Sequence, residues 1–333
     1  MTSQRKRTFE ILPGVYRIIL PLPGEKPGPM NVYLFTGKPV TILDTGTLKS
    51  VPVLKRELAG LGMTFADIEQ IVLTHGHIDH YGGAASIVRE AGPGITVAAH
   101  TEDLTLIEHG IEVPKRQFAR YYRLMGAPFI FQVSLMAVQW IFMSMAEKCD
   151  VTRHLADGDT IDLGGHRATV ISTPGHTRGS VSLYLKKESM VFPGDHILGH
   201  ITPNAFVMLE TDFVLPRRMS QIEFYESLGK IEKLGPRIAY PAHGQPIEDV
   251  RGVIGMFRDQ FRQRQGYILS ILAGGEHTVY EIGRALFPDI RGKRLPLEIF
   301  LMVSEVYTHL QVLEKEGRVA SRMRGSALRY RLS

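Results

Sequence analysis

The chain has 333 residues, of which 44% are hydrophobic and 22% are charged, so it can form one large and one small domain of an ordinary soluble globular protein. Its single cysteine, Cys149, excludes an intrachain disulfide, and no apolar signal segment follows the charged start, which together predict a cytoplasmic location. The formal net charge is +5, and residues 251–333 account for this excess because they hold 14 basic and 8 acidic side chains.

The chain up to about residue 240 alternates between strand-like and helical segments. Short apolar runs between Gly and Pro turns predict strands, and longer amphipathic stretches predict helices. The first expected elements are strands at 15–20, 31–35 and 40–44, a helix at 51–61, a strand at 71–73, a helix at 82–91 and a strand at 95–99. The later ones are strands at 167–172, 181–185 and 190–192, a helix at 221–234 and a strand at 238–240. Two strand-rich halves with helices between them predict an α/β fold with two stacked sheets covered by helices on both sides.

The pattern changes near residue 250. Three stretches there have helical spacing with charged faces, and two short strands that turn near Gly325 follow them. The expected helices are at 253–272, 279–287 and 298–316. Helices followed by such a hairpin predict a winged helix-turn-helix. We therefore expect a catalytic domain over residues 1–250 and a small winged-helix domain over residues 251–333.

The segment from Thr74 to His80 brings four metal-ligand side chains together within six residues. It reads Thr-His-Gly-His-Ile-Asp-His and stands where a predicted strand ends and a helix begins. Neutral imidazoles and carboxylates are ligands for divalent metals such as zinc, and a loop at the end of a strand can turn alternate side chains toward one point. The segment therefore predicts a metal site.

This segment matches the His-x-His-x-Asp-His signature of the metallo-β-lactamase superfamily, which the chain resembles over about residues 10–250. The other motifs of the family stand in the family's order: Asp44 in Leu-Asp-Thr-Gly, His176 in Pro-Gly-His-Thr, Asp195 in Pro-Gly-Asp-His and His243 in Pro-Ala-His-Gly. The resemblance implies an αββα sandwich with two metal ions. The stretch after Asp195 resembles a subgroup whose members carry a C-terminal winged helix.

The resemblance also implies how seven ligands would divide between the two metals. The ligands are His75, His77 and His176 for one metal, Asp79, His80 and His243 for the other, and Asp195 as a bridge between both. Two such ions can share a water, lower its pKa and direct the bridging hydroxide at a carbonyl or phosphorus. Asp79 would orient this hydroxide or take its proton, and Asp44 would orient ligands without touching metal. Zinc is the expected metal, and the ligand types also admit iron or manganese.

More residues lie between His80 and His176 than in compact members of this family, which predicts an insertion at about 111–150. Within it, residues 127–146 carry no charge. A membrane span is rejected because polar side chains interrupt this run and catalytic motifs lie on both sides of it. We interpret the insertion as a helical lid that shapes an apolar substrate pocket, and extra core or a dimer interface are the alternatives. The pocket candidates are Phe129, Phe131, Met136, Trp140 and Phe142, with His200 after Asp195 as a polar candidate.

The leading functional hypothesis is hydrolysis of a small-molecule ester or thioester with an apolar acyl group, for example an acyl-CoA, by a homodimer. The runner-up is a single-strand endoribonuclease, since the basic tail could bind phosphates. The basic residues in question are Arg291, Lys293, Arg294, Arg322, Arg324, Arg329 and Arg331. A glyoxalase II-like thioesterase is disfavoured because that enzyme carries glutathione-binding helices where this chain predicts a winged helix. A metal-sensing DNA-binding regulator, the non-enzymatic alternative, is disfavoured by a complete ligand set.

Overall fold

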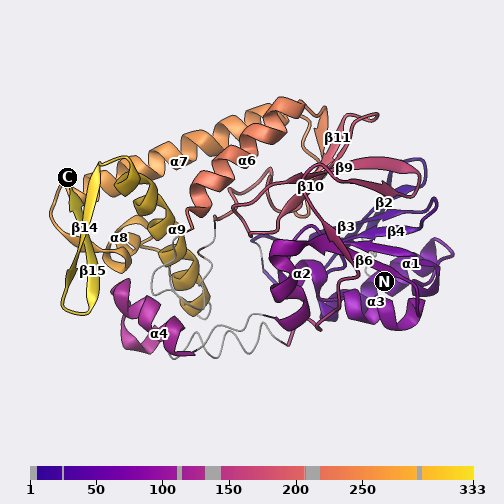
Figure 1. Ribbon diagram of the computed structural model, residues 1–333, viewed down its shortest axis with the longest axis horizontal. Coiled ribbons are helices and arrows are strands. Elements are labelled where there is room, and N and C mark those ends of the chain that lie inside the picture. Colours follow the sequence, from indigo (N-terminus) through magenta and orange to yellow (C-terminus); the bar gives the residue numbers. More distant parts are fainter. Residues whose placement is uncertain are drawn as a thin grey trace.

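Two β-sheets stack face to face and carry helices on their outer faces, as the computed structural model in Figure 1 shows. The structure describes residues 6–24, 26–110, 115–131, 144–205, 207, 218–290 and 295–333. This arrangement is the two-layer sheet sandwich with outer helices that the sequence predicts. Within the described residues, no helix is both long and apolar enough to cross a membrane.

The first sheet contains, within the described residues, seven strands in the order of the chain. They are β1 (Thr8–Leu12), β2 (Val15–Leu20), β3 (Met30–Phe35), β4 (Thr41–Leu43), β5 (Gln70–Val72), β6 (Thr96–His100) and β7 (Arg153–Leu155). Strands β1 to β4 pair antiparallel, whereas β4 to β7 pair parallel. The carboxyl ends of the parallel strands therefore meet along one edge of the sheet.

The second sheet has the strand order β12-β11-β10-β9-β8. Its strands are β8 (Thr160–Leu163), β9 (His166–Ser172), β10 (Val181–Leu185), β11 (Met190–Phe192) and β12 (Ile238–Ala239). The pairs are antiparallel except that β12 returns parallel to β11. The loops after β9, β11 and β12 carry the remaining sequence motifs.

The helices divide between the two outer faces. On the first sheet lie α1 (Val51–Gly60) and α3 (Ala84–Ala91), with the short α2 (Ile78–Tyr81) at the sheet edge; on the second lie α6 (Ser220–Leu234) and α7 (Val250–Leu272). Short helical turns connect these elements: η1 (Leu48–Ser50), η2 (Phe65–Asp67), η3 (Thr101–Asp103) and the π-helical η4 (Thr105–His109).

Strand β3 shows why both faces of the first sheet are apolar. All six of its residues are buried, and successive side chains of a strand point to opposite faces. Val32 and Leu34 pack with the outer helices, whereas Tyr33 and Phe35 face the second sheet. The layer between the sheets includes edge-to-face contacts of Phe192 with both aromatic rings. A strand buried on both sides reads as a continuous apolar run, which is how the sequence predicts it.

The C-terminal region forms its own small core around α8 (Val279–Leu286) and α9 (Leu295–Lys315). A three-stranded sheet in the order β13-β15-β14 completes it, with β13 (His277–Thr278), β14 (Val319–Arg324) and β15 (Ala327–Leu332). Thr278 and Glu281 form a reciprocal capping box at the start of α8. Helix α7 spans both parts of the molecule, because its first half packs on the second sheet and its last turns join the C-terminal core.

The first described part of the predicted insertion lies against the C-terminal region. Helix α4 (Lys115–Leu124) buries Tyr121 and Tyr122 in the same core as α8 and α9, and Figure 1 shows it beside these elements. The backbone N–H of Tyr280 donates to the carbonyl of Met125 at 2.9 Å. Residues 144–150, by contrast, return to the first sheet, where the N–H of Leu48 donates to the carbonyl of Met145 at 2.8 Å.

Candidate metal centre

The functional motifs occupy loops at one edge of the two sheets. Each loop begins where a strand ends: Asp44 after β4, the segment 74–80 after β5, His176 after β9, Asp195 after β11 and His243 after β12. Loops at the carboxyl ends of parallel strands are where open α/β sheets place their functional groups. The stacking of the sheets brings these loops together although they are spread over about 200 positions of the chain.

Asp44 fixes the start of the His-x-His-x-Asp-His loop. Its buried carboxylate accepts hydrogen bonds from the backbone N–H and the hydroxyl of Thr74, both at 2.8 Å. The same carboxylate lies 2.9 Å from Nδ1 of His80. Asp44 adopts a left-handed backbone conformation, with φ of 59°, which aspartate tolerates better than most residues. This contact leaves Nε2 of His80 to point into the site.

The structure brings the potential ligand atoms of the seven predicted residues close together. The potential ligand atoms of His75, His77 and His176 lie within 4.8 Å of one another, and so do those of Asp79, His80 and His243. His75, His80 and Asp195 form a third, overlapping group. All of these residues are buried except His77 and Asp79, which are half-buried and mark the open side of the site.

Asp195 lies between the two groups. One carboxylate oxygen, Oδ2, is 3.6 Å from Nε2 of His176, which belongs to the first group. The other oxygen, Oδ1, is 3.6 Å from Nε2 of His80 and 3.5 Å from Nε2 of His243, which belong to the second. One oxygen therefore faces each group, as a bridging carboxylate requires.

The loop that carries His243 is held by strand β3. The side-chain amide of Asn31 donates to the carbonyls of Pro241 and Gly244, both at 2.9 Å, and the hydroxyl of Tyr33 donates to Pro241 at 2.7 Å. Nδ1 of His243 lies 3.1 Å from the carbonyl of Gly28. These contacts orient the imidazole so that Nε2 faces Asp79 and Asp195.

Burial and charge set the ionisation of the first group for metal binding. Burial, and then the neighbouring imidazole of His176, lowers the pKa of His77 to about 3. Burial also lowers the pKa of His75 well below its usual value. Both rings are neutral at pH 7, which is the form that binds a metal ion.

The second group combines carboxylates with imidazoles that hold protons when no metal is bound. Burial alone would raise the pKa of Asp79, but the imidazoles of His80 and His243 outweigh it and lower that pKa to about 2. Burial alone would lower the pKa of His80, but the carboxylates of Asp44 and Asp195 raise it well above its usual value. A divalent cation would displace such protons, since imidazole binds metal in its neutral form.

Orphaned buried atoms show that the second group suits a cation. Nε2 of His80, Nε2 of His243 and Oδ1 of Asp195 have no hydrogen-bond partner among the described residues. An unpaired buried polar atom costs about 1–3 kcal/mol, so such atoms rarely gather without a ligand. Imidazole nitrogens and a carboxylate oxygen that converge in this way are typical ligands of zinc and related metals.

The predicted substrate-pocket residues lie in different surroundings. Nε2 of His200 donates to the carbonyl of Pro27 at 2.8 Å, and its exposed ring lies beside Gly244, next to His243. Phe129 is 72% exposed, whereas the ring of Phe131 lies 6.1 Å from that of Tyr280 in α8, a contact that gives it a packing role. Met136, Trp140 and Phe142 lie outside the described residues.

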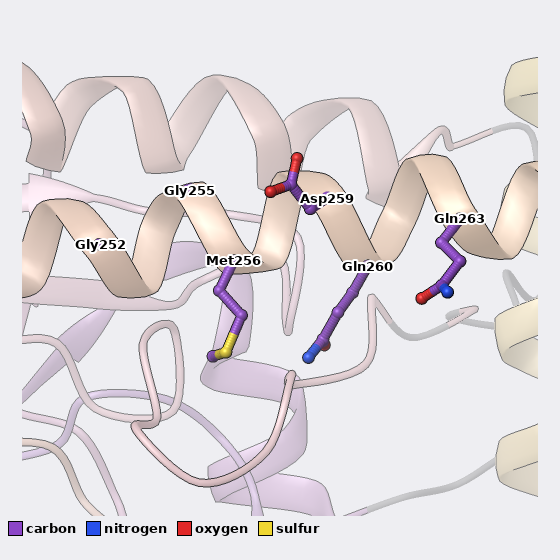
Figure 2. A pocket seen from close by; sticks show the side chains of 6 residues that line it. All are labelled: Gly252, Gly255, Met256, Asp259, Gln260 and Gln263. Carbon is purple, nitrogen blue, oxygen red and sulfur yellow. The ribbon is translucent and has the colours of Figure 1, made fainter.

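A groove of about 620 Å³ lies beside α7 (Figure 2). It is lined by Gly252, Gly255, Met256, Asp259, Gln260 and Gln263. In Figure 2, Met256 and Gln260 point from the helix toward the loop below it. The lining residues include none of the seven predicted ligands, so the groove is distinct from the candidate metal centre.

Two kinds of supporting residue were not among the sequence predictions. Asn31 and Tyr33 stand inside a strand, where nothing in the pattern indicates a contact with a loop more than 200 residues away. Asp103 is fully buried and contacts two ligand loops. A signal for Asp103 was present, because it follows β6 at the same sheet edge as the metal motifs.

Fold and site together define the class of the protein, a two-sheet α/β sandwich with a histidine- and aspartate-rich metal-ligand cluster at its loop edge. Residues 26–243 match the family model described as "Metallo-beta-lactamase superfamily". The chain belongs to this superfamily, which confirms the resemblance seen in its motifs.

Similar proteins support this assignment. The chain is 29% identical over 311 residues to "Probable metallo-hydrolase YqjP" of Bacillus subtilis, with 91% of this chain and 93% of the relative covered. It is 24% identical over 280 residues to "Atrochrysone carboxyl ACP thioesterase" of Aspergillus fumigatus, with 82% and 69% covered. The crystal structure of a metallo-beta-lactamase family protein from Thermus thermophilus superposes with a TM-score of 0.82 at 27% identity, covering 97% of this chain and 100% of that one. The prediction of a metal-dependent hydrolase is confirmed.

Proposed function

We propose that the protein hydrolyses a small-molecule ester or thioester with an apolar acyl group, and that a thioester is the preferred substrate. The observation that carries this proposal is the pair of ligand groups joined by Asp195, since paired metal sites activate water against a carbonyl. The similarity to a relative named as an acyl-carrier-protein thioesterase supports a thioester. The proposed metal is zinc, and iron or manganese would suit the same ligands.

The residues of the site have separate roles in this reaction. Two divalent ions held by the ligand groups would supply an activated water and polarise the substrate carbonyl. Asp79 stands at the open side, where its side chain is 18% exposed, and it is a carboxylate at neutral pH because its pKa is about 2. It can therefore orient the attacking water by accepting a hydrogen bond. Asp44 keeps His80 in position through Nδ1.

We assign the binding of the substrate's acyl group to the insertion. On the basis of the sequence, Met136, Trp140 and Phe142 would supply apolar surface for it. Phe129 is exposed at the described end of the insertion, as a residue that meets substrate would be. His200, beside the loop of His243, is proposed as a polar contact at the rim of the site.

We further propose that the C-terminal region is a winged-helix domain, because α7, β13, α8, α9 and the β14–β15 hairpin follow one another in that order. Its charges favour an acyl substrate over RNA. The Arg322 side chain donates to Glu276 at 2.5 Å, and that of Arg329 donates to Glu281 at 3.3 Å. An RNA phosphate would have to compete with these carboxylates. The region then serves association, in a cytoplasmic homodimer, and not nucleic-acid binding.

The test is turnover by metal-quantified protein on matched substrates. A panel of alkyl and aryl acyl-CoA thioesters, simple esters and single-stranded RNA would be compared, with Asp79→Asn as the control variant. We expect thioester hydrolysis that Asp79→Asn reduces by about 10²-fold or more, the range typical of a general acid or base. The proposal would be overturned if the protein cleaved RNA and did not hydrolyse the thioesters.

A further inference from the structure

Asp103 is a buried carboxylate that contacts two separate ligand loops. It ends η3, directly after β6, and it is fully buried. Its Oδ2 accepts from the backbone N–H of Gly76 at 2.8 Å and from the hydroxyl of Thr177 at 2.6 Å. Its Oδ1 accepts from the backbone N–H of Gly179 at 2.8 Å. Three donors therefore satisfy both oxygens of this carboxylate.

In the sequence, the three donor residues stand next to or near the histidines of one ligand group. Gly76 stands between His75 and His77, and Thr177 directly follows His176. The group that these histidines form comes from two loops about 100 residues apart in the sequence, and Asp103 joins the backbones of both. Its three bonds go to Gly76, Thr177 and Gly179, and none of them goes to Asp79, His80 or His243.

The local sequence is built around this contact. A Cβ on Gly179 would lie 2.7 Å from Cγ of Asp103, and a Cβ on Gly76 would lie 3.2 Å from its Cβ. Glycine at both positions lets the two loops approach Asp103 this closely. Thr177 is also fixed from the other side, because its N–H and hydroxyl contact the hydroxyl of Ser180 at 3.1 and 2.8 Å.

Asp44 provides a contrast within the same site. Its carboxylate contacts the ring of a predicted ligand, His80, and also accepts two bonds from Thr74. The carboxylate of Asp103 instead bonds to backbone N–H groups and one hydroxyl. Its effect is therefore on the distance between two loops and not on the basicity of a ligand.

We propose that Asp103 is a positioning residue that presets the His75, His77 and His176 group for its metal ion by clamping the two loops that carry it. This inference rests on the proposed metal centre. Outer contacts of this kind typically change metal affinity about 10- to 100-fold. The loss of Asp103 should weaken the first metal site and spare the second.

The experiment measures zinc affinity in chains that keep only one of the two groups. His243→Ala leaves the first group intact, and His77→Ala leaves the second. Asp103→Asn is added to each background, because an Asn amide must set its NH₂ against either the Gly179 N–H or the Gly76 N–H. Zinc affinity is then measured by competition with a chelating dye.

The inference predicts a zinc affinity about 10- to 100-fold lower for Asp103→Asn in the His243→Ala background and within about twofold of its parent in the His77→Ala background. Equal losses in both backgrounds, or none in the first, would overturn the inference. A wild-type chain that binds no zinc, iron or manganese would instead overturn the proposed metal centre itself.

Two further variants separate positioning from general stability. Thr177→Val removes one donor to Asp103, so it should lower the zinc affinity of the first site by less than Asp103→Asn does. If Asp103→Asn does not fold, the result for Thr177→Val tests the proposal in its place. Gln70→Ala removes a different buried polar link, in which the Gln70 amide donates to Thr41 and Asp162. It should lower the melting temperature without changing zinc affinity. An equal loss of zinc affinity in Gln70→Ala would show that Asp103 acts only through stability.

Discussion

The loop edge of the sandwich and the C-terminal region differ in how their polar side chains are grouped. At the loop edge, imidazoles and carboxylates converge in a buried space, and several of their atoms lack partners among the described residues. In the C-terminal region, Arg322 and Arg329 of the hairpin pair with Glu276 and Glu281, and aliphatic and aromatic side chains form most of the interior around Tyr121, Tyr122 and Tyr330. Within the described residues, the potential metal ligands therefore gather at the loop edge, whereas the C-terminal region packs against α4 and the end of α7.

The largest expected effect is at the loop edge. His77→Ala removes one of the three members of the first ligand group, so the chain should lose one metal and about 10³-fold or more in turnover, because metal activation of water and carbonyl supplies several kcal/mol. Metal content and kcat on the same preparation check this. Retention of both metals by a folded His77→Ala protein would contradict the proposed metal-binding role of the first ligand group at the loop edge.

A stability change without a metal change is expected where α4 meets the C-terminal region. Gly126 has φ of 79°, and a Cβ there would lie 2.6 Å from the side chain of Thr278. Gly126→Ala should lower the free energy of unfolding by about 1–3 kcal/mol through overpacking and strain. Denaturant unfolding measures this loss, and metal content per chain should stay unchanged.

The matched control for that prediction is Gly229→Ala in α6. An added Cβ at Gly229 would meet nothing within 4 Å, and alanine favours a helix interior by about 0.5–1 kcal/mol over glycine. The control should therefore be neutral or stabilising. Equal destabilisation by both substitutions would argue against a close contact between residues 125–127 and α8.

A buried histidine between α6 and α9 gives the C-terminal region a pH dependence of its own. Burial, and then the charge of Arg264, lowers the pKa of His309 to about 3, so the ring is neutral when folded. Because the folded pKa lies below the usual value of about 6.5, this contribution to stability is fully present above about pH 6.5 and is lost as the pH falls toward 3.

Chemical unfolding of the metal-free protein from about pH 6 to about pH 4 tests this dependence. Wild type should lose about 1.4 kcal/mol more per pH unit than His309→Gln, which corresponds to one extra proton bound on unfolding. Parallel stability profiles for the two proteins would show that His309 is protonated in the folded state.

The smallest effect is expected at the hairpin. Arg322 and Arg329 pair with carboxylates at the surface, and these carboxylates are not among the predicted ligands. Arg322→Gln combined with Arg329→Gln should leave kcat/KM on an acyl thioester unchanged. A selective loss of activity on single-stranded RNA would show instead that these side chains bind a phosphate backbone.

Strands were predictable where an uninterrupted apolar run marks them, and they were missed where polar or charged side chains interrupt that run. Strands β2, β10 and β11 begin and end where the sequence pattern predicts them, because each is an apolar run that is buried in the sandwich. The short β7 and β8 were missed, since Arg153, His154 and Asp162 interrupt their apolar content. Their pairing with β6 and β9 defines them as strands, and no local signal carries that information.

The candidate site also contains residues that the sequence predicts and residues that it does not predict. The seven predicted ligands stand in short motifs, and their residue types and spacing were sufficient to predict residues whose potential ligand atoms lie close together in the structure. Asp103 was missed because its role depends on contacts with Gly76 and Thr177, which lie 27 and 74 positions away. The surroundings of Phe131 could not be read from its neighbours either, because they are set by the docking of residues 115–131 on α8 and α9.

A zinc titration of the chelator-treated wild-type protein, with bound metal and acyl-thioester hydrolysis measured on the same samples, tests whether hydrolysis depends on two bound metal ions. We expect no turnover without metal and activity that rises to its maximum as two zinc ions bind per chain. Undiminished turnover by the metal-free protein would contradict this expectation.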